Sequence, residues 1–276
     1  MTDRVVAVLG QGVVDPAAAL VDPADLGVIR GDAVFETIRL ADGRLDAEEA
    51  HLKRLVRSAE MLDLPAPDAA ACGALLASAG AAWGDRGEAS VRLVYTRGDG
   101  TTPTCFVVVE PIPEHIYGQR RDGLRVVTLD RGLPADAGNG RPWLLVGAKT
   151  TSYAVNMAAV RVAKSRGADD AIFVSTGGEV LEGPTATVVW ARDGVLHTPP
   201  VEVGILAGTT VQTVWRNAAA HGLGTAYTRA SVHDLHAADG VWLVSSVRGA
   251  VTVVAIDGIG RGDSGVTAKV QSAAGL

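Results

Sequence analysis

"WLLVGAKTTSYAVN" (residues 143–156) ends an apolar run at a lysine and continues with small hydroxyl residues. Lysine is scarce in this chain, which has four lysines against twenty-one arginines. Apolar neighbours partly desolvate an ammonium group, and this favours the neutral amine that acts as a nucleophile. Lys149 is therefore a candidate for an amine that forms an imine with a carbonyl group. The alternative is an ordinary lysine at a strand end, with its charge extended into water.

The composition is that of a folded protein without membrane spans. A chain of 276 residues can form one large domain or two smaller ones. Hydrophobic residues make up 47%, yet no apolar run approaches the roughly 18 residues that a membrane span requires. The N-terminus lacks the long apolar region of an export signal, so we expect a cytoplasmic protein. The net charge of −6 argues against nonspecific nucleic-acid binding.

The chain has two cysteines, Cys72 and Cys105. Two isolated cysteines are too few for a disulfide framework or for a cysteine metal cluster. We expect both to be buried, reduced and packed as small hydrophobic residues, and the sequence predicts no metal site.

Residues 1–112 are predicted to form an N-terminal α+β domain. Apolar and polar residues alternate in RVVAVLG and AVFETIRLADGRL, and Asp42-Gly43 is a typical hairpin turn. Residues 46–63 have apolar side chains at helical spacing and acidic ones in the first turn, which predicts a helix. A second helix is expected in AAACGALLASAGAAW, followed by strands in ASVRLVYTRG and TCFVVVEPIP.

Prolines, glycines and charges of both signs in EPIPEHIYGQRRDG are typical of a connection between domains. We place the connection at residues 113–123 and a C-terminal α/β domain at residues 124–276. Strands are expected there in LRVVTL, DAIFVS, TVVWARDGVLHT and GVWLVSSVRGAVTVVAIDG. Helices are expected over residues 153–165 and 209–221, and Gly222 is a normal C-terminal stop for the second.

Three further segments place polar groups where a ligand can bind. In GGEVLEGPTATVVW, Glu182 follows a predicted strand and turn, where a carboxylate can face a cavity. In GILAGTT, Gly208-Thr209-Thr210 begins a helix, so free N–H groups, hydroxyls and the helix dipole favour an anion such as phosphate. The alternative is a threonine N-cap on a structural helix. Ser245 and Ser246 follow an apolar strand and add hydroxyl donors.

An amine, a carboxylate and an anion cradle are together what pyridoxal phosphate requires from a protein. The order of six motifs also resembles a known family: RGDAVFETIRL, HLKRL, GAKTTSYAVN, GGEVLEG, TPP and GILAGTT are similar to those of the fold-type IV pyridoxal-phosphate enzymes. This family includes branched-chain aminotransferases, D-amino acid aminotransferases and aminodeoxychorismate lyases. The resemblance implies a two-domain α+β fold like that of D-amino acid aminotransferase, with pyridoxal 5'-phosphate at the domain interface.

The resemblance also implies roles for single residues. Lys149 is similar to the lysine that binds the cofactor covalently, and Glu182 to the glutamate bonded to the pyridine nitrogen. Tyr153 is similar to a tyrosine near the cofactor's phenolic oxygen, although a packing tyrosine is an alternative. Phosphate binding is implied for Arg54, Thr209, Thr210 and Ser246. For Arg54 the alternative is an arginine on a helix surface.

Three positions concern the substrate. Many relatives have an aromatic residue where this chain has Arg30, and a cation there can hold a substrate carboxylate. Thr187 stands where many relatives have asparagine, so a local hydrogen bond can be replaced. Arg97 in YTRGDG matches an arginine that relatives place near the substrate carboxylate. Arg30 and Arg97 are therefore candidate substrate-binding residues.

The segments KTTSYA, EGPTATVV and VWLVSSVRGAV most resemble the aminodeoxychorismate lyases. The implied reaction converts 4-amino-4-deoxychorismate to 4-aminobenzoate and pyruvate, for folate synthesis. The alternative is an aminotransferase for D-amino or branched-chain amino acids, and one site can support both reactions. A noncatalytic binding protein is disfavoured, because Lys149 and Glu182 are both present. The resemblance further implies a homodimer that acts on a small-molecule amine.

Overall fold

The computed structural model describes residues 4–262 and 264–275, which form two compact units. Unit 1 contains the residues up to Pro113 together with Ala148–Tyr153. Unit 2 contains Glu114–Gly147 together with the residues from Ala154 onward. The segment that carries Lys149 therefore belongs to unit 1, although it lies beyond the domain boundary that we expected from the sequence.

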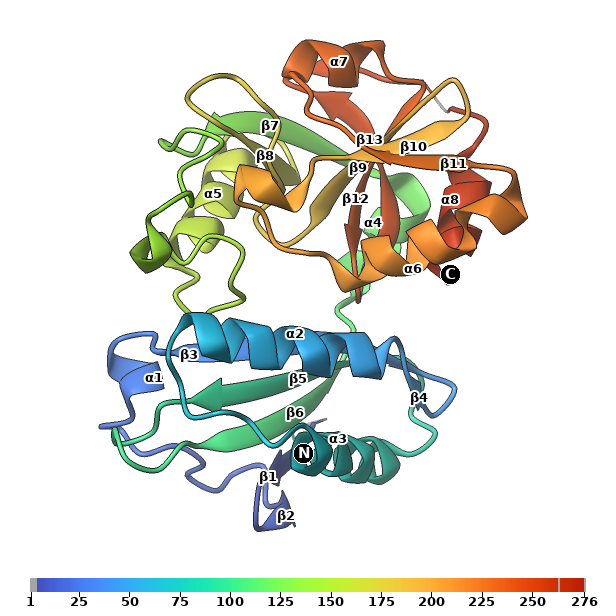
Figure 1. The fold of residues 1–276 in the computed structure, drawn as a ribbon. Coiled ribbons are helices and arrows are strands. Elements are labelled where there is room, and N and C mark those ends of the chain that lie inside the picture. Colours follow the sequence, from blue (N-terminus) through green and yellow to red (C-terminus); the bar gives the residue numbers. More distant parts are fainter. Residues whose placement is uncertain (1–3, 263, 276) are drawn as a thin grey trace. The chain divides into compact units, whose positions relative to one another are not determined.

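Unit 1 contains, among the described residues, a six-stranded antiparallel sheet with the order β2-β1-β6-β5-β3-β4 (Figure 1). Buried and partly exposed residues alternate along β3, as expected for a strand with one face on a core. Between β3 and β4, Asp42 and Gly43 have φ angles of 50° and 71°, the left-handed values of the predicted tight turn. The strands are β1 (Val5–Val8), β2 (Gly12–Val14), β3 (Ala33–Ala41), β4 (Arg44–Leu45), β5 (Ala89–Thr96) and β6 (Cys105–Pro111).

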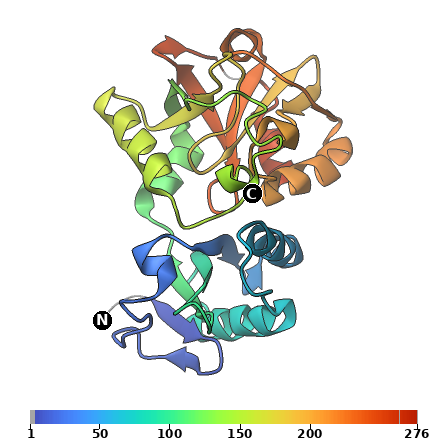
Figure 2. The ribbon, with the colours of Figure 1, turned by 60° about the vertical axis from the view of Figure 1, so that its left-hand side comes forward.

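Helices α2 and α3 cover the same face of this sheet (Figure 1 and Figure 2). Glu48 and Glu49 place negative charge in the first turn of α2, where the helix dipole favours it. At the start of α3, the Asp68 side chain accepts hydrogen bonds from two backbone N–H groups. The helix predicted over residues 46–63 is confirmed. The helices of unit 1 are α1 (Leu26–Ile29), α2 (Glu48–Met61) and α3 (Ala69–Trp83).

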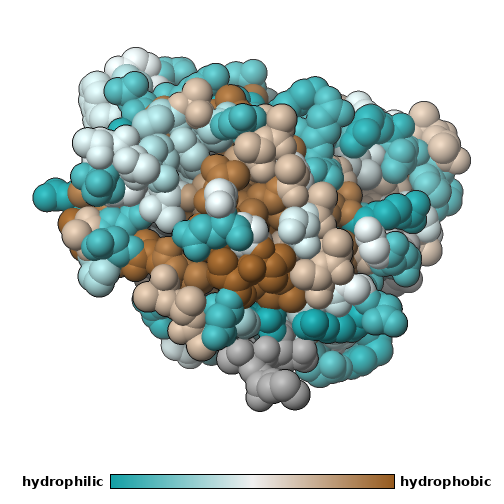
Figure 3. Space-filling view, turned by 90° about the horizontal axis from the view of Figure 1, so that it is seen from below, coloured by the Kyte–Doolittle hydropathy of each residue, from teal (hydrophilic) through white to brown (hydrophobic). Residues whose placement is uncertain are grey.

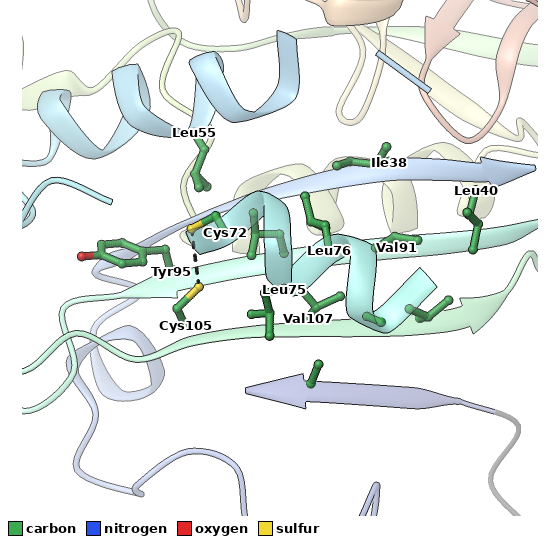
Figure 4. Close-up of a cluster of buried hydrophobic side chains, with 14 of the residues drawn as sticks. Ile38, Leu40, Leu55, Cys72, Leu75, Leu76, Val91, Tyr95, Cys105 and Val107 are labelled. Atoms are coloured by element: carbon green, nitrogen blue, oxygen red, sulfur yellow. Dashed lines mark hydrogen bonds between the residues drawn. The ribbon is translucent and has the colours of Figure 1, made fainter. Parts of the chain in front are cut away.

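The core of unit 1 lies between the sheet and these two helices (Figure 4). Leu55 from α2, Leu76 from α3 and Ile38 from β3 are fully buried in it. Complete burial of such a side chain contributes about 1.5–3 kcal/mol to stability. Cys72 and Cys105 lie in the same core as free thiols, with 3.9 Å between their sulfur atoms. The expectation that both cysteines are buried and reduced is confirmed.

Unit 2 contains a mixed sheet whose strand order in the described residues is β11-β10-β9-β12-β13-β7-β8, with β14 beside β13. Alternate residues of β9 enter two different cores: Val188 and Trp190 pack in one, Val189 and Ala191 in the other. Both faces of the central strands are therefore covered, which explains their unbroken apolar sequences. The strands are β7 (Leu124–Asp130), β8 (Asp170–Val174), β9 (Thr187–Arg192), β10 (Val195–Thr198), β11 (Gly224–Tyr227), β12 (Gly240–Ser245), β13 (Gly249–Ile256) and β14 (Ile259–Gly260).

The helices of unit 2 pack against this sheet in separate places. Helix α5 lies against β7 and β8, whereas α6 and α8 pack together beside β12 and β13 (Figure 1). The connection expected at residues 113–123 is helical over most of its length, as α4. The helices are α4 (Glu114–Asp122), α5 (Ala154–Ser165), α6 (Thr209–Ala218), α7 (Val232–Ala237) and α8 (Thr267–Ala274). No helix in the described ranges has the length and apolar character needed to cross a bilayer.

Candidate active site

The Lys149 segment is held in unit 1 by its backbone. The carbonyl oxygen of Lys149 accepts a hydrogen bond from the Phe35 N–H on β3, at 3.0 Å. The Thr151 N–H donates to the Ala33 carbonyl, at 2.9 Å. On the other side, the Lys149 N–H donates to the Ser58 hydroxyl on α2, at 3.1 Å. Lys149 therefore depends on two elements, β3 and α2, for its position.

The amine of Lys149 lies against two aromatic rings. Its Nζ is 4.2 Å from the ring centroid of Phe35 and 5.6 Å from that of Tyr153. The two rings meet edge to face, with centroids 5.2 Å apart and an interplanar angle of 83°. Aromatic faces attract an ammonium group while they exclude water from one side of it. The partial desolvation expected from the apolar run is thus provided by Phe35 and Tyr153.

A buried ionic network joins the same two elements. The Glu36 side chain, on β3, is fully buried. The carboxylate accepts two hydrogen bonds from Arg54, from Nε at 2.8 Å and from Nη2 at 2.6 Å. It also lies 2.7 Å from Nδ1 of His51. His51, Arg54 and Ser58 are three and four residues apart on α2, so they lie on the face that the helix turns toward the sheet.

The charges of this network follow from its surroundings. Burial raises the pKa of Glu36, but the charge and hydrogen bonds of Arg54, assisted by His51, outweigh it and lower the pKa to about 2. Burial lowers the pKa of His51, with Glu36 opposing the shift. The positive charges of Arg54 and Lys149 lower the pKa of His51 further. His51 is therefore neutral at pH 7, and its Nδ1–H donates to the Glu36 carboxylate, which can only accept.

Sequence reasoning missed Glu36, His51 and Phe35. One signal was present, because Glu36 occupies an inward position in the alternating pattern AVFETIRL. A charged residue at such a position requires a buried partner, and Arg54 is that partner. The interpretation of Arg54 as a surface arginine is therefore wrong, since only 8% of its side chain is exposed.

In unit 2, Glu182 lies in the loop between β8 and β9. One carboxylate oxygen accepts a hydrogen bond from Arg131 Nη1 at 3.2 Å, and the other from the Leu206 N–H at 3.1 Å. Arg131 is itself placed over the ring of Phe173, with 5.5 Å between its guanidinium carbon and the ring centroid. The carboxylate is thus held from two directions, and 14% of the side chain is exposed. Arg131 is a further residue of this site that the sequence motifs did not reveal.

The N-terminus of α6 is shaped by a close approach at Gly208. A Cβ atom on this residue would lie 2.5 Å from the hydroxyl oxygen of Thr187, so only glycine fits there. Thr209 is buried and Thr210 half-buried in the first helical turn, which begins as predicted. The loop before the helix borders a cavity of about 260 Å³. Thr187, noted in the sequence as a departure from the family pattern, is thus the residue that contacts the glycine of this turn.

Ser246 lies in the turn between β12 and β13, and two arginines anchor this turn. Arg248 pairs with the buried Asp170 at 2.7 Å and donates to the hydroxyl of Thr185 at 2.6 Å. Arg120 on α4 donates to the Val247 carbonyl at 2.5 Å. The turn with Ser246 is therefore fixed to β8 and to the loop that follows Glu182.

The two arginines proposed for the substrate differ in their surroundings. Arg30 is exposed at the C-terminal end of α1, and its guanidinium makes no ion pair within the described ranges. Arg97, in contrast, forms a two-pronged ion pair with Asp32, from Nε at 2.6 Å and from Nη2 at 3.3 Å. It also donates to the carbonyl oxygens of Leu62 and Asp63, at 2.7 and 2.9 Å. Four of its five N–H groups are thus committed within unit 1.

The groups present match the chemistry of pyridoxal phosphate. Unit 1 contains the primary amine of Lys149 beside two aromatic rings, and the guanidinium of Arg54, whose orientation is fixed by Glu36. Unit 2 supplies a carboxylate held by two donors and a helix N-terminus with two threonines, where an anion is favoured. An aldehyde, a phosphate and a pyridine nitrogen require such groups.

Comparisons with known proteins agree with this chemistry. The model of the family described as amino-transferase class IV matches residues 33–256. The chain is 46% identical over 257 residues to the bifunctional aminodeoxychorismate lyase / D-amino acid transaminase of Mycobacterium tuberculosis, covering 89% of both chains. A solved PLP-bound form of a hypothetical aminotransferase from the same organism has a TM-score of 0.94 at 44% identity, covering 98% of both chains. The fold IV-transaminase CpuTA1 from Curtobacterium pusillum has a TM-score of 0.93 at 42% identity, covering 99% of this chain and 97% of its own.

The chain therefore belongs to the class IV aminotransferase family. The two-domain fold-type IV architecture, which the six motifs predicted, is confirmed. The family match also establishes the protein as an enzyme, of the aminotransferase or lyase kind.

The buried network yields a prediction for stability. Glu36→Gln removes the carboxylate partner of a buried arginine, so the free energy of unfolding at pH 7 should fall by about 3–5 kcal/mol, as measured by urea denaturation. The pKa of Glu36 drops from its ordinary 4.5 to about 2 on folding, so the ionised form stabilises the fold above pH 4.5 and loses this effect as the pH falls through 2. The difference in the free energy of unfolding between wild type and Glu36→Gln should therefore become smaller as the pH falls from 4.5 to about 2.

Glu88→Gln is the matched control. Glu88 is one of two carboxylate partners of Arg39, which lies on β3 as Glu36 does, but 26% of the Glu88 side chain is exposed. This change should cost about 1 kcal/mol or less. Equal losses in the two variants, or a Glu36→Gln loss that persists undiminished near pH 2, would contradict the assignment.

Proposed function

We propose that this protein is a pyridoxal-phosphate-dependent aminodeoxychorismate lyase, with D-amino acid transamination as a second activity of the same site. The lyase reaction converts 4-amino-4-deoxychorismate to 4-aminobenzoate and pyruvate, and it would supply folate synthesis in the cytoplasm. The observation that carries the proposal is the 46% identity, over 89% of both chains, with a relative named for both activities. The segment VWLVSSVRGAV, which resembles the lyases, supports the lyase reaction as the main activity and transamination as the second.

Pyridoxal 5'-phosphate is the cofactor, and the family motifs assign the residues that would hold it. Lys149 would bind it covalently, Arg54 would contact its phosphate and Tyr153 would lie near its phenolic oxygen. Glu182 would bond to its pyridine nitrogen. The phosphate is also held by residues at the start of α6 and in the β12–β13 turn: Thr209, Thr210 and Ser246. The local geometry supports these roles, because Arg54 and Glu182 are each fixed by ionic partners.

The bound cofactor supplies an aromatic ring that takes up the electron pair left when a proton leaves the amine-bearing carbon. Lys149 is the base that removes this proton, and its amine must be neutral to do so. Glu182, held beside Arg131, would stabilise positive charge on the ring nitrogen. In the lyase reaction pyruvate then leaves and the carbocycle becomes aromatic. In transamination the ammonium group of Lys149, formed when it takes up that proton, would deliver the proton to a carbon of the cofactor instead of to the substrate carbon.

The substrate of the lyase reaction carries two carboxylates, and Arg30 is assigned to one of them. Its support is the combination of a motif position next to Gly31-Asp32 and an exposed guanidinium without an ion pair in the described ranges. A charged contact of this kind contributes about 2–5 kcal/mol if it is desolvated.

A test of the cofactor site starts from the colour of the purified protein, which should be yellow. Borohydride reduction and peptide mapping should find the cofactor on Lys149. Because a general base contributes roughly 10²–10⁴-fold, Lys149→Ala should lower turnover by at least that factor. If the cofactor is found on Lys53, Lys164 or Lys269 instead, the assignment of Lys149 as the cofactor-binding lysine is wrong.

The choice of reaction is tested by coupling purified aminodeoxychorismate synthase to this protein and measuring 4-aminobenzoate by fluorescence. A parallel panel pairs D- and L-amino acids with 2-oxoglutarate or pyruvate. We expect 4-aminobenzoate formation and transamination of D-amino acids, with both lost in Lys149→Ala. If no 4-aminobenzoate forms while an amino acid, including a branched-chain one, is transaminated rapidly, the enzyme is an aminotransferase.

We also propose a homodimer. Exposed hydrophobic residues support it: Leu9 and Val13 in unit 1 are 39% and 49% exposed, and Trp143 and Val155 in unit 2 are 70% and 67% exposed. Figure 3 shows a continuous hydrophobic area on one face of the protein. Such areas are typical of surfaces that contact another chain. Sedimentation velocity of the purified enzyme should show a dimer, and a fully active monomer would refute this assignment.

A further inference from the structure

The turn between β12 and β13 is short. Ser245 at the end of β12 lies opposite Gly249 at the start of β13, so the connection consists of Ser246, Val247 and Arg248. Gly249 has a φ of 71°, a left-handed value that is typical of the residue closing a three-residue hairpin loop. Pairing of the two strands fixes the ends of this turn. Its tip, which carries Ser246, needs contacts outside the hairpin to be held in one position.

Arg248 makes such contacts within unit 2. Its Nη1 donates to Oδ2 of Asp170 at 2.7 Å, and its Nη2 donates to the hydroxyl of Thr185 at 2.6 Å. The side chains of Arg248 and Asp170 are only 9% and 4% exposed, so their ion pair is shielded from water. The other oxygen of Asp170 accepts a hydrogen bond from the Ala171 N–H at 2.9 Å, which orients the carboxylate. Arg248 is thus bound to two partners outside its own hairpin.

Both partners belong to the part of the chain that carries Glu182. Asp170 is the first residue of β8, the strand that precedes Glu182. Thr185 follows Glu182 by three residues, in a tight turn that is closed by a hydrogen bond of 2.8 Å from the Gly183 N–H to the Ala186 carbonyl. The guanidinium of the β12–β13 turn is therefore bonded to the strand before Glu182 and to the turn after it.

The spacing of these segments matters for a ligand of fixed shape. The pyridine nitrogen and the phosphate ester of pyridoxal phosphate are attached to one aromatic ring, so the distance between them varies little. In the proposed site Glu182 bonds to the nitrogen and Ser246 to the phosphate. Both contacts can form together only if the protein keeps these two residues at one separation. A separation that is already fixed before binding avoids an entropy cost when the ligand binds.

We propose that Arg248 is a positioning residue that holds the β12–β13 turn, and with it Ser246, at the distance from Glu182 that the cofactor phosphate requires. A guanidinium suits this role, because its nitrogens bond different partners in one plane and so fix direction as well as distance. The functional part of the inference rests on the proposed function, in which Ser246 contacts the phosphate. The structural part, that Arg248 holds residues 246–248 in place, is independent of it.

The first experiment measures hydrogen exchange of the peptide that contains residues 244–250, in full-length protein prepared without cofactor. Arg248→Gln and Asp170→Asn should each raise exchange at the turn about tenfold, because its local opening becomes easier. Thr185→Val removes one hydrogen bond and leaves the ion pair intact, so it should raise exchange less, by about threefold. This milder variant keeps the test valid if a variant that breaks the buried ion pair does not fold.

Asp169→Asn is the matched control. Asp169 is the neighbour of Asp170 and pairs with Arg125 at 3.3 Å, but 35% of its side chain is exposed. None of its hydrogen bonds in the described residues reaches the β12–β13 turn. Its replacement should leave the exchange of residues 244–250 unchanged. Melting temperatures of all variants show how far a difference reflects a general loss of stability.

The second experiment measures the Kd of pyridoxal 5'-phosphate and the Kd of pyridoxal, which lacks the phosphate, by absorbance with the cofactor-free protein. Arg248→Gln should raise the Kd of pyridoxal phosphate about tenfold, because a hydrogen bond to a charged group is lost. The Kd of pyridoxal should change less than about threefold, since Glu182 keeps its own bonds to Arg131 and Leu206. A general structural defect would weaken both ligands alike.

A double-mutant cycle tests whether Arg248 acts through Ser246. Ser246→Ala should raise the Kd of pyridoxal phosphate by a factor similar to that of Arg248→Gln. The double variant should lie within about twofold of either single variant, since both changes remove the same phosphate contact. Arg248→Lys should recover part of the affinity, because a lysine can keep the ion pair with Asp170 but not the second bond to Thr185.

Three results would overturn the proposal. One is unchanged exchange of residues 244–250 in both Arg248→Gln and Asp170→Asn. Another is an equal loss of affinity for pyridoxal and pyridoxal phosphate in Arg248→Gln. The third is a double variant in which the effects of Arg248→Gln and Ser246→Ala multiply. If the wild-type protein binds no pyridoxal phosphate, the proposed function fails together with the functional part of this inference, but the exchange result still decides whether Arg248 holds the turn.

Discussion

The structure of unit 1 depends on a carboxylate with no access to water. Glu36 would be costly to bury alone, and the fold compensates with a two-pronged bond from Arg54 and a third bond from His51. Because Glu36 is on β3 and its partners His51 and Arg54 are on α2, these bonds also hold the helix against the strand. Lys149 is then held by hydrogen bonds from these two elements, so the ionic network and the position of the amine are one structural feature.

A second ionic link acts at the end of the same pair of elements. Arg97 binds Asp32 before β3 and the last carbonyl oxygens of α2, and it is partly exposed, whereas the Glu36 network is buried. The two links differ in what they stabilise. The buried network is sensitive to loss of any partner, because an unpaired charge remains in the interior. The pair of Arg97 and Asp32 is partly exposed, so it contributes less to stability than the buried network.

In unit 2, the carboxylate of Glu182 is likewise held in place by its hydrogen-bond partners. This carboxylate is held by Arg131 and by a backbone N–H, so its orientation does not depend on solvent. The turn with Ser246 is fixed by the buried pair of Arg248 and Asp170. Groups fixed in this way bind a ligand without paying further conformational entropy, which is the advantage of a preorganised site.

The sequence by itself determined the family, the helix over α2, the hairpin at Asp42-Gly43 and the motif positions Lys149 and Glu182. These features are local, because turn residues, helical spacing and short motifs are read from neighbours in the chain. The tertiary structure alone decided that the Lys149 segment joins unit 1 and that Arg97 is engaged with Asp32, 65 residues away. It also decided that Arg54 is buried on Glu36. Such pairings cannot be recognised from a periodic pattern in the sequence, because they depend on which strand and helix the folded chain brings together.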